Sequence, residues 1–357
     1  MLESTEHDGY PRPGIDRRDF LRASLIAGAG ALAGTRAQAV LAAESAPRTD
    51  RAHVAITLDL EMSRNFPNWE DTHWDYEKGN LNAETKAYTV EACRRVKAVG
   101  GVVHLFAVGR VCEQENVDWL RDLVAAGHRV GNHTYDHVNV RATKPDDVQF
   151  RFQRAPWLLE GRSPEQAIVE NIRLATVALA ERAGIRVDGF RTPGGFQMGL
   201  ADRPDVQKLI SAQGFDWVSS KYPAHPNTDP GQEPSEAIYA GIVQAQAAAQ
   251  PFLYESGLCE VPMSPISDIG AFRHGRWQLE WFLESIRRGL GWAIENHSVY
   301  DFLGHPSCLY VTDPQFRAVD LMCQMVAKAG DHASLVDLGT IAQRARAQAA
   351  AKAIKPS

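Results

Sequence analysis

Short apolar runs alternate with longer amphipathic stretches along most of this 357-residue sequence. The apolar runs predict buried strands at residues 54–58, 102–108, 187–190, 215–218, 258–261, 299–303 and 334–338. Helical spacing is found at residues 83–99, 116–126, 164–184, 203–213, 234–249, 276–289 and 314–329. Repeated strand–helix pairs are typical of parallel βαβ units. Seven or eight such units in about 300 residues favour an α/β fold with a closed or nearly closed (β/α)7–8 barrel over an open sheet. We expect one barrel domain at 53–345 and a helical tail at 346–357.

The amino terminus has the pattern of an export signal. Arg17-Arg18 precede an uncharged run of 13 residues at 23–35, and small residues at 37–39 offer an A-x-A cleavage site. The paired arginines followed by x-Phe-Leu resemble a twin-arginine signal. A short membrane anchor and a core helix are the alternatives, but a span needs about 20 residues. The sequence predicts a signal peptide at 1–39, a tether at 40–52, and a periplasmic or secreted protein without a stable membrane anchor after cleavage.

Charge and cysteine content exclude several classes of protein. The formal net charge is −6 and no long basic block occurs, which argues against a nucleic-acid partner. The number of cysteines is odd, at five, and no C-x-x-C pair is present. A disulfide scaffold and a thiolate zinc site are therefore not expected, although one disulfide stays open.

The segment from His133 to His137 has the pattern H-x-x-x-H. Two imidazoles at this spacing meet on one face if the segment is helical. Neutral imidazoles bind zinc well, and catalytic zinc often takes two histidines and one carboxylate. Taken alone the pattern is weak, because a polar loop with two unrelated histidines looks the same.

Two more strand ends carry groups suited to catalysis. Alternation along the first predicted strand puts Asp59 and Glu61 on the same side, which suits a base and a metal ligand. In the segment Arg191–Gly195, the glycines let backbone N–H groups approach a ligand, and Arg191 is suited to holding a carboxylate. Solvated strand-end carboxylates and a Pro-Gly turn with a surface arginine are the alternatives.

Polar residues also follow or flank aromatic ones at Asp216-Trp217 and at Phe302–His305. A histidine at a strand end is suited to general-acid catalysis, and an aspartate is suited to fixing its tautomer. Core aromatics beside solvated polar residues are the alternative. His297 competes with His305, but His305 ends an apolar run and leaves 30 residues before Leu335, enough for a helix and the last strand.

Taken in order, these motifs resemble those of the polysaccharide deacetylases, the NodB-homology carbohydrate esterases of the family 4 type. The resemblance runs from residue 52 to residue 341 and rests on the Asp59/Glu61 pair and on His133–His137, Arg191–Pro193, Asp216-Trp217 and Leu303–His305. It implies a distorted (β/α) barrel. Two positions depart from the family pattern: Glu61 lies one residue beyond the usual second aspartate, and Gly194 stands where the sugar deacetylases often have tyrosine.

The resemblance implies a divalent metal, with Zn²⁺ the expected ion, held by Glu61, His133 and His137. Asp59 would then be the base, although an exchange of roles between Asp59 and Glu61 is left open. By the same resemblance, His305 would protonate the leaving amine.

The remaining matched residues would support these groups. The resemblance implies that Arg191 holds Asp59 and that Asp216 orients His305. The backbone N–H of Gly194 would stabilise the oxyanion, and Trp217 and Leu303 would wall the acetyl pocket.

The implied activity is metal-dependent removal of N-acetyl groups from a polysaccharide or oligosaccharide, so the expected partner is an N-acetylated glycan. Hydrolysis of a small cyclic amide or ureide, as by an allantoinase, is one alternative, and a non-catalytic carbohydrate-binding barrel is another. Trp74 lies between polar neighbours in the stretch after the first strand, and we expect it to be a sugar-stacking platform. Packing of this ring against the barrel is the alternative.

Overall fold

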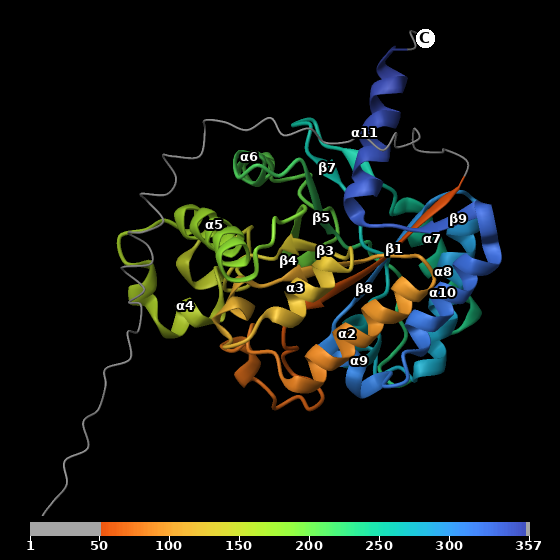
Figure 1. Ribbon diagram of the computed structural model, residues 1–357, viewed down its shortest axis with the longest axis horizontal. Coiled ribbons are helices and arrows are strands. Elements are labelled where there is room, and N and C mark those ends of the chain that lie inside the picture. The colour runs from red at the N-terminus through yellow and green to blue at the C-terminus, as the bar shows by residue number, and fades with distance from the viewer. Residues whose placement is uncertain (1–50, 355–357) are drawn as a thin grey trace, which may run out of the picture. The chain divides into compact units, whose positions relative to one another are not determined.

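The computed structural model describes residues 51–354, which lie in one compact unit (Figure 1). The predicted signal peptide at 1–39 and nearly all of the predicted tether at 40–52 lie outside the described residues. The predicted tail is not a separate element, because a single helix, α11, runs from Leu338 to Ile354.

Within residues 51–354, nine strands form one sheet. Their bounds are β1 Ala52–Leu60, β2 Val103–Ala107, β3 Arg129–Asn132, β4 Phe190–Phe196, β5 Trp217–Lys221, β6 Phe252–Leu253, β7 Cys259–Glu260, β8 Val299–Gly304 and β9 Ala333–Leu335. The α-helices are α2 Ala83–Ala98, α3 Asp118–Ala125, α4 Phe150–Arg154, α5 Pro164–Ala183, α6 Pro204–Ala212, α7 Glu236–Ala248, α8 Leu279–Glu295, α9 Pro306–Thr312, α10 Arg317–Ala329 and α11. A π-helix, η5, covers Ile269–His274.

The strand order is β6-β7-β5-β4-β3-β2-β1-β8, and β9 pairs with β1. All neighbours pair in parallel except β6 and β7. The two ends of the curled sheet share no ladder among the described strands, but Ser264 N donates to Asp301 O across the gap at 2.9 Å. The fold is therefore a distorted, incompletely closed (β/α) barrel, in agreement with the predicted class.

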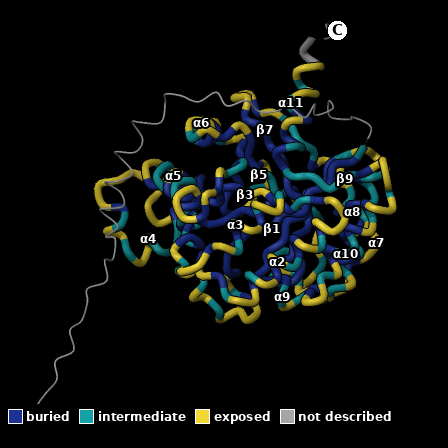
Figure 2. The backbone as a smooth tube through the Cα atoms, viewed as in Figure 1, coloured by how far each residue is buried: buried dark blue, intermediate teal, exposed yellow. Residues whose placement is uncertain are grey.

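Burial on both faces explains why the strands read as apolar runs. All nine residues of β1 are buried, and β2 and β8 flank it. Figure 2 shows β1, β3 and β5 as a buried interior, with exposed positions on the surrounding helices. A parallel sheet covered by helices requires such strands.

Local signals place the helix ends. Ser163 and Gln166 form a reciprocal capping box at the start of α5, with Pro164 in the first turn. Gly184 ends the helix with φ of +64°, a left-handed conformation that glycine adopts without a steric penalty. The predicted helix at 164–184 is therefore confirmed nearly to the residue.

Two predicted strands are displaced, and the displacement matters for function. The strand expected at 187–190 begins at Phe190 and includes the Arg191–Gly195 motif. The strand expected at 215–218 begins at Trp217. Asp216 and Trp217 thus lie at the amino end of β5, whereas Glu61, His133 and His305 directly follow the carboxyl ends of β1, β3 and β8.

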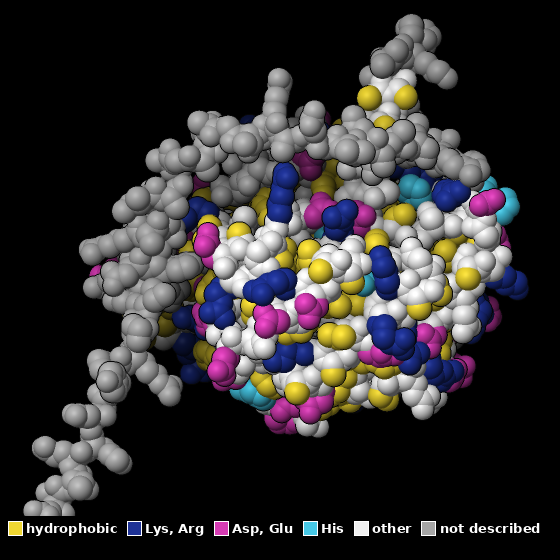
Figure 3. All heavy atoms as spheres, in the orientation of Figure 1, with side chains coloured by type: hydrophobic (Ala, Val, Ile, Leu, Met, Phe, Trp, Pro, Cys, Tyr) yellow, Lys and Arg dark blue, Asp and Glu magenta, His cyan; other side chains and the backbone are white. Residues whose placement is uncertain are grey.

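The structure also bears on cysteine pairing, membrane-spanning helices and the distribution of surface charge. All five cysteines are buried and unpaired, so the open question of a disulfide is settled against one. Within the described residues, no helix has the length and apolar character needed to cross a membrane. On the face drawn in Figure 3, basic and acidic side chains are interspersed.

Candidate metal and catalytic site

The carboxyl ends of β1, β3, β4 and β8 meet at one edge of the sheet, because these strands are parallel. A cavity of about 390 Å³ opens there. Its wall includes Asp59, Glu61, His133, His137 and His305. Residues predicted from three separate motifs are therefore gathered in one place.

Glu61, His133 and His137 have the composition and spacing of a metal site. One ligand atom from each lies within 4.8 Å of the others. The His133 Nδ1 lies 2.9 Å from the carbonyl oxygen of Arg191, so Nδ1 is the donor and the Nε2 lone pair is left for a ligand. Burial lowers the pKa of His133 to about 4, which keeps the ring in the neutral, ligating form.

The His133–His137 segment is a strained turn. The sequence predicted that its two rings meet on one face if the segment is helical, but the segment is not a helix. Thr134 and His137 have φ values of +58° and +59°. Asn132 Oδ1 accepts from Thr134 N at 2.8 Å, and Thr134 Oγ1 accepts from Val138 N at 2.9 Å. These bonds hold the turn, and the two rings lie with centroids 5.0 Å apart. Backbone strain of this kind persists where surrounding structure fixes it, often at functional sites.

Glu61 is buried and strongly polarised. Its Oε2 lies 2.6 Å from His137 Nε2 but accepts no hydrogen bond of normal geometry, and its Oε1 accepts from Lys78 Nζ at 3.0 Å. Burial alone would raise the pKa of Glu61, but the charges of His137 and Lys78 hold it well below its usual value. One carboxylate and two imidazoles gathered in this way form a donor set that fits a divalent cation.

A buried arginine holds Asp59 by a hydrogen bond. Arg191 is fully buried and donates from Nη1 to Asp59 Oδ1 at 3.0 Å and from Nη2 to Asp301 Oδ2 at 2.8 Å. Its guanidinium also lies over the Phe106 ring at 4.3 Å. Because Oδ1 is occupied, Asp59 presents Oδ2 toward the cavity, 3.7 Å from His133 Nε2 and 4.0 Å from His305 Nε2. The geometry matches the expectation that Arg191 holds Asp59.

His305 is oriented by Asp268, and the expectation that Asp216 does this is wrong. Asp268 Oδ1 lies 2.9 Å from His305 Nδ1, and Oδ2 accepts from His305 N at 2.6 Å. Burial alone would lower the pKa of His305, but Asp268 and then Asp59 and Glu61 raise it above the ordinary value. The Asp216 side chain is 69% exposed, pairs with Arg346 at 3.4 Å, and lies at the opposite end of its strand.

Neither predicted aromatic residue lies on the cavity wall, and the platform role of Trp74 stays a prediction. Trp217 is buried against His104 and Phe106, with ring centroids at 5.5 and 6.2 Å, and is not among the residues that line the cavity. Trp74 packs against the main hydrophobic core beside His73 and is likewise absent from the cavity wall. The packing alternative considered for Trp74 therefore describes its position.

Leu303 and Gly194 do line the cavity, as expected. Gly194 has φ of +79°, a conformation in which a tyrosine would be strained, so the departure from the family pattern has a backbone cause. Sequence reasoning missed Asp268, Lys78 and Asp301. Asp301 had a signal, since it is a charged residue inside a buried strand, whereas Lys78 lies in a loop without a recognisable pattern.

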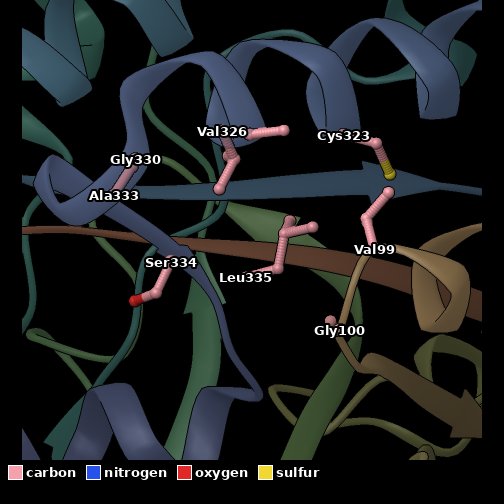
Figure 4. Close-up of a pocket in the computed structure, with 10 residues that line it drawn as sticks. Val99, Gly100, Cys323, Val326, Gly330, Ala333, Ser334 and Leu335 are labelled. Atoms are coloured by element: carbon pink, nitrogen blue, oxygen red, sulfur yellow. The ribbon is translucent and has the colours of Figure 1, made fainter.

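Two other features resemble sites but carry no chemistry. His104, Asp188 and Asp337 also bring three ligand-type atoms together, but His104 donates from Nε2 to Asp188 O at 2.9 Å and accepts at Nδ1 from Leu338 N at 3.3 Å. Both ring nitrogens are thus occupied. Figure 4 shows a hollow of about 260 Å³ beside α10, where Val326, Cys323 and Val99 project and the lining holds no acid or base.

Comparison with known proteins supports the reading of the motifs. Residues 74–209 match the family model described as "Polysaccharide deacetylase", a match that includes both metal-site histidines and Arg191 and covers less than half of the chain. Among curated protein sequences, none matches this chain.

Solved structures share the fold at low sequence identity. A polysaccharide deacetylase from Mycobacterium smegmatis, described as putative, is similar with a TM-score of 0.56 and 18% identity, over 85% of this chain and 93% of that one. The allantoinase Puue is similar at 0.55 and 14%, over 84% and 92%. A probable polysaccharide deacetylase from Pseudomonas aeruginosa PAO1 is similar at 0.55 and 13%, over 83% and 91%.

The motif-bearing part of the chain is therefore similar to polysaccharide deacetylases, and the described chain shares its fold with two such deacetylases and an allantoinase.

Proposed function

We propose that this protein is an exported, metal-dependent hydrolase that removes N-acetyl groups from a polysaccharide or oligosaccharide. The observation that carries the proposal is the convergence of Glu61, His133 and His137 within 4.8 Å, with Asp59 and His305 on the same cavity wall. Export rests on the Arg17-Arg18 motif and the uncharged run that follows it, which lie outside the described residues.

Glu61, His133 and His137 would hold the cation, with Zn²⁺ the expected ion. A divalent cation bound there supplies Lewis-acid polarisation of the amide and lowers the pKa of water. Either Asp59 or Glu61 could be the base, and we assign this role to Asp59. Arg191 binds one oxygen of Asp59 and leaves the other facing the cavity. Glu61 is the ligand, and Asp59 Oδ2 accepts a proton from the attacking water.

His305 has the opposite task. Its raised pKa favours the protonated ring, which can donate from Nε2 to the leaving amine. Asp268 fixes the ring by accepting from Nδ1. Gly194 lines the cavity, and its N–H would stabilise negative charge on the former carbonyl oxygen. Leu303 supplies an apolar surface for the acetyl methyl group.

Acetate release from N-acetylated chito-oligosaccharides by the purified mature protein tests the proposal. We expect turnover that is lost with chelator and restored by Zn²⁺, and that is absent in His133→Ala. Ring opening of allantoin, assayed in parallel, tests the ureide alternative, which is supported by the fold shared with the allantoinase and by Gly194. Turnover of allantoin alone, or glycan binding without any turnover, would contradict the proposal.

A further inference from the structure

Arg273 places a positive charge at the cavity without a matching carboxylate. It lies in η5, the π-helix Ile269–His274, and π-helical turns are rare and recur at functional sites. The half-buried side chain lines the cavity. Its Nη1 donates to the carbonyl oxygen of Arg64 at 3.0 Å, and its Nε donates to His274 Nε2 at 3.1 Å. Both acceptors are neutral. The Arg64 acceptor is a backbone carbonyl oxygen, and the pKa of His274 is lowered by burial and then by the charge of Arg273.

Neighbouring cations are paired differently. Lys78 pairs with Glu61 at 3.0 Å, and Arg141 pairs with Asp202. Arg273 has no carboxylate oxygen within 4.0 Å in the part of the chain that the structure describes. A guanidinium that is partly withdrawn from water without an anion is unfavourable. Its planar fork is suited to binding a carboxylate through two parallel hydrogen bonds.

The position of Arg273 indicates where such an anion would lie. Arg273, Lys78 and His137 line both the catalytic cavity and an adjoining groove of about 500 Å³. Two carboxylates, Asp146 and Asp147, also line the groove, so it is not uniformly cationic. A substrate that extends from the cavity into the groove therefore passes Arg273 close to the reacting centre.

We propose that the substrate carries a carboxylate near its scissile amide and that Arg273 binds this group. The inference rests on the proposed function, since it concerns the same cavity. It makes Arg273 a specificity-determining residue that selects acidic over neutral substrates. The carboxylate has two possible sources, an acidic N-acetyl sugar or a small ureido acid, and both present the same group to the guanidinium.

Matched ligand pairs test the proposal on the full mature protein. N-acetylmuramic acid and N-acetylglucosamine, presented in oligosaccharides of equal length, differ by a lactyl carboxylate. N-carbamoylglycine and its amide give the corresponding ureide pair. For each pair we measure kcat/KM and, separately, Kd by calorimetry, in wild type, Arg273→Gln and Arg273→Lys. Arg154→Gln is the matched control, because Arg154 is exposed and lines neither space.

We expect the wild type to prefer the acidic member of one pair by about 10- to 100-fold, the range of a charge-assisted hydrogen-bonded contact. Arg273→Gln removes this preference in kcat/KM and Kd, Arg273→Lys keeps part of it, and Arg154→Gln keeps all of it. The pair that shows the effect identifies the source. Equal affinity for both members in wild type, or a preference that survives in Arg273→Gln, overturns the inference. If the protein binds the acidic member selectively through Arg273 but turns over neither member, the proposed function is refuted and the inference stands.

Discussion

Replacing Asp268 by Asn tests the assignment of His305 and its partner. Both oxygens of Asp268 accept hydrogen bonds from N–H groups, at 2.6 Å from His305 N and 2.9 Å from His305 Nδ1. In Asp268→Asn, the amide NH2 group must face one of these donors. The variant therefore loses the negative charge beside the ring and one well-formed hydrogen bond.

The size of the effect follows from these contacts. A charge-assisted hydrogen bond contributes about 1.5–3 kcal/mol and a neutral one about 0.5–1.5 kcal/mol, so the exchange costs about 1–1.5 kcal/mol. Since 1.4 kcal/mol is a factor of about ten, this exchange alone should lower kcat by about 5- to 13-fold near neutral pH, and the lost hydrogen bond should lower it further. The loss should be smaller than the 10²–10⁴-fold, roughly, that general-acid catalysis contributes in total.

The pH dependence of kcat shows in which direction the pKa of His305 changes. Asp268 raises the pKa of His305, so the protonated acid persists to higher pH in the wild type. Loss of the carboxylate lowers that pKa, and the alkaline limb of the kcat profile should move to lower pH. Acetate release measured across the pH range, at fixed ionic strength and saturating metal, shows the shift.

Asp216→Asn is the matched control, because its exposed carboxylate pairs with Arg346 far from His305. We expect a change within about twofold, as for other surface ion pairs. An unchanged profile in Asp268→Asn, or the loss appearing in Asp216→Asn, would refute the reasoning.

Three further substitutions test other parts of the account. Asp59→Asn should retain the cation while acetate release falls by about 10²–10⁴-fold, and loss of the cation here with retention in Glu61→Gln would reverse the two roles. Trp74→Ala should lower the free energy of unfolding, measured by chemical denaturation, by about 1–2 kcal/mol, because the ring packs on the core. KM should stay unchanged, and a raised KM for oligosaccharides at unchanged stability would support the platform hypothesis instead. Lys78→Met should destabilise the chelator-treated protein by about 3 kcal/mol, because it removes the cation paired with Oε1 of buried Glu61. Zn²⁺ should recover most of the loss in thermal melts, and equal destabilisation with and without Zn²⁺ would contradict a metal at Glu61.

The fold was predictable because its signals are local. Apolar runs such as the β1 strand and the capping residues around α5 specify elements whatever their neighbours are, and strand–helix alternation then selects a parallel barrel. The site was predictable where a residue ends a strand, since parallel strands bring those ends together. Asp59, Glu61 and His305 were found in this way, and His133 was found from its spacing to His137.

Contacts between distant segments could not be predicted. The resemblance implies that Asp216 orients His305, but Asp216 directly precedes β5 and so lies at the amino end of that strand, away from His305. Asp268 reaches His305 from a turn 37 residues earlier, and no periodicity marks that turn. Lys78 likewise meets Glu61 only through the path of its loop.

Metal content of purified variants tests the central claim most directly. The account predicts a stoichiometric divalent cation in the wild type and in Asp337→Asn, which alters the other three-residue cluster, and predicts loss of the cation in His137→Ala and Glu61→Gln with the fold retained by circular dichroism. Retention of the cation in His137→Ala and Glu61→Gln, or its loss in Asp337→Asn alone, would contradict a catalytic metal site at Glu61, His133 and His137.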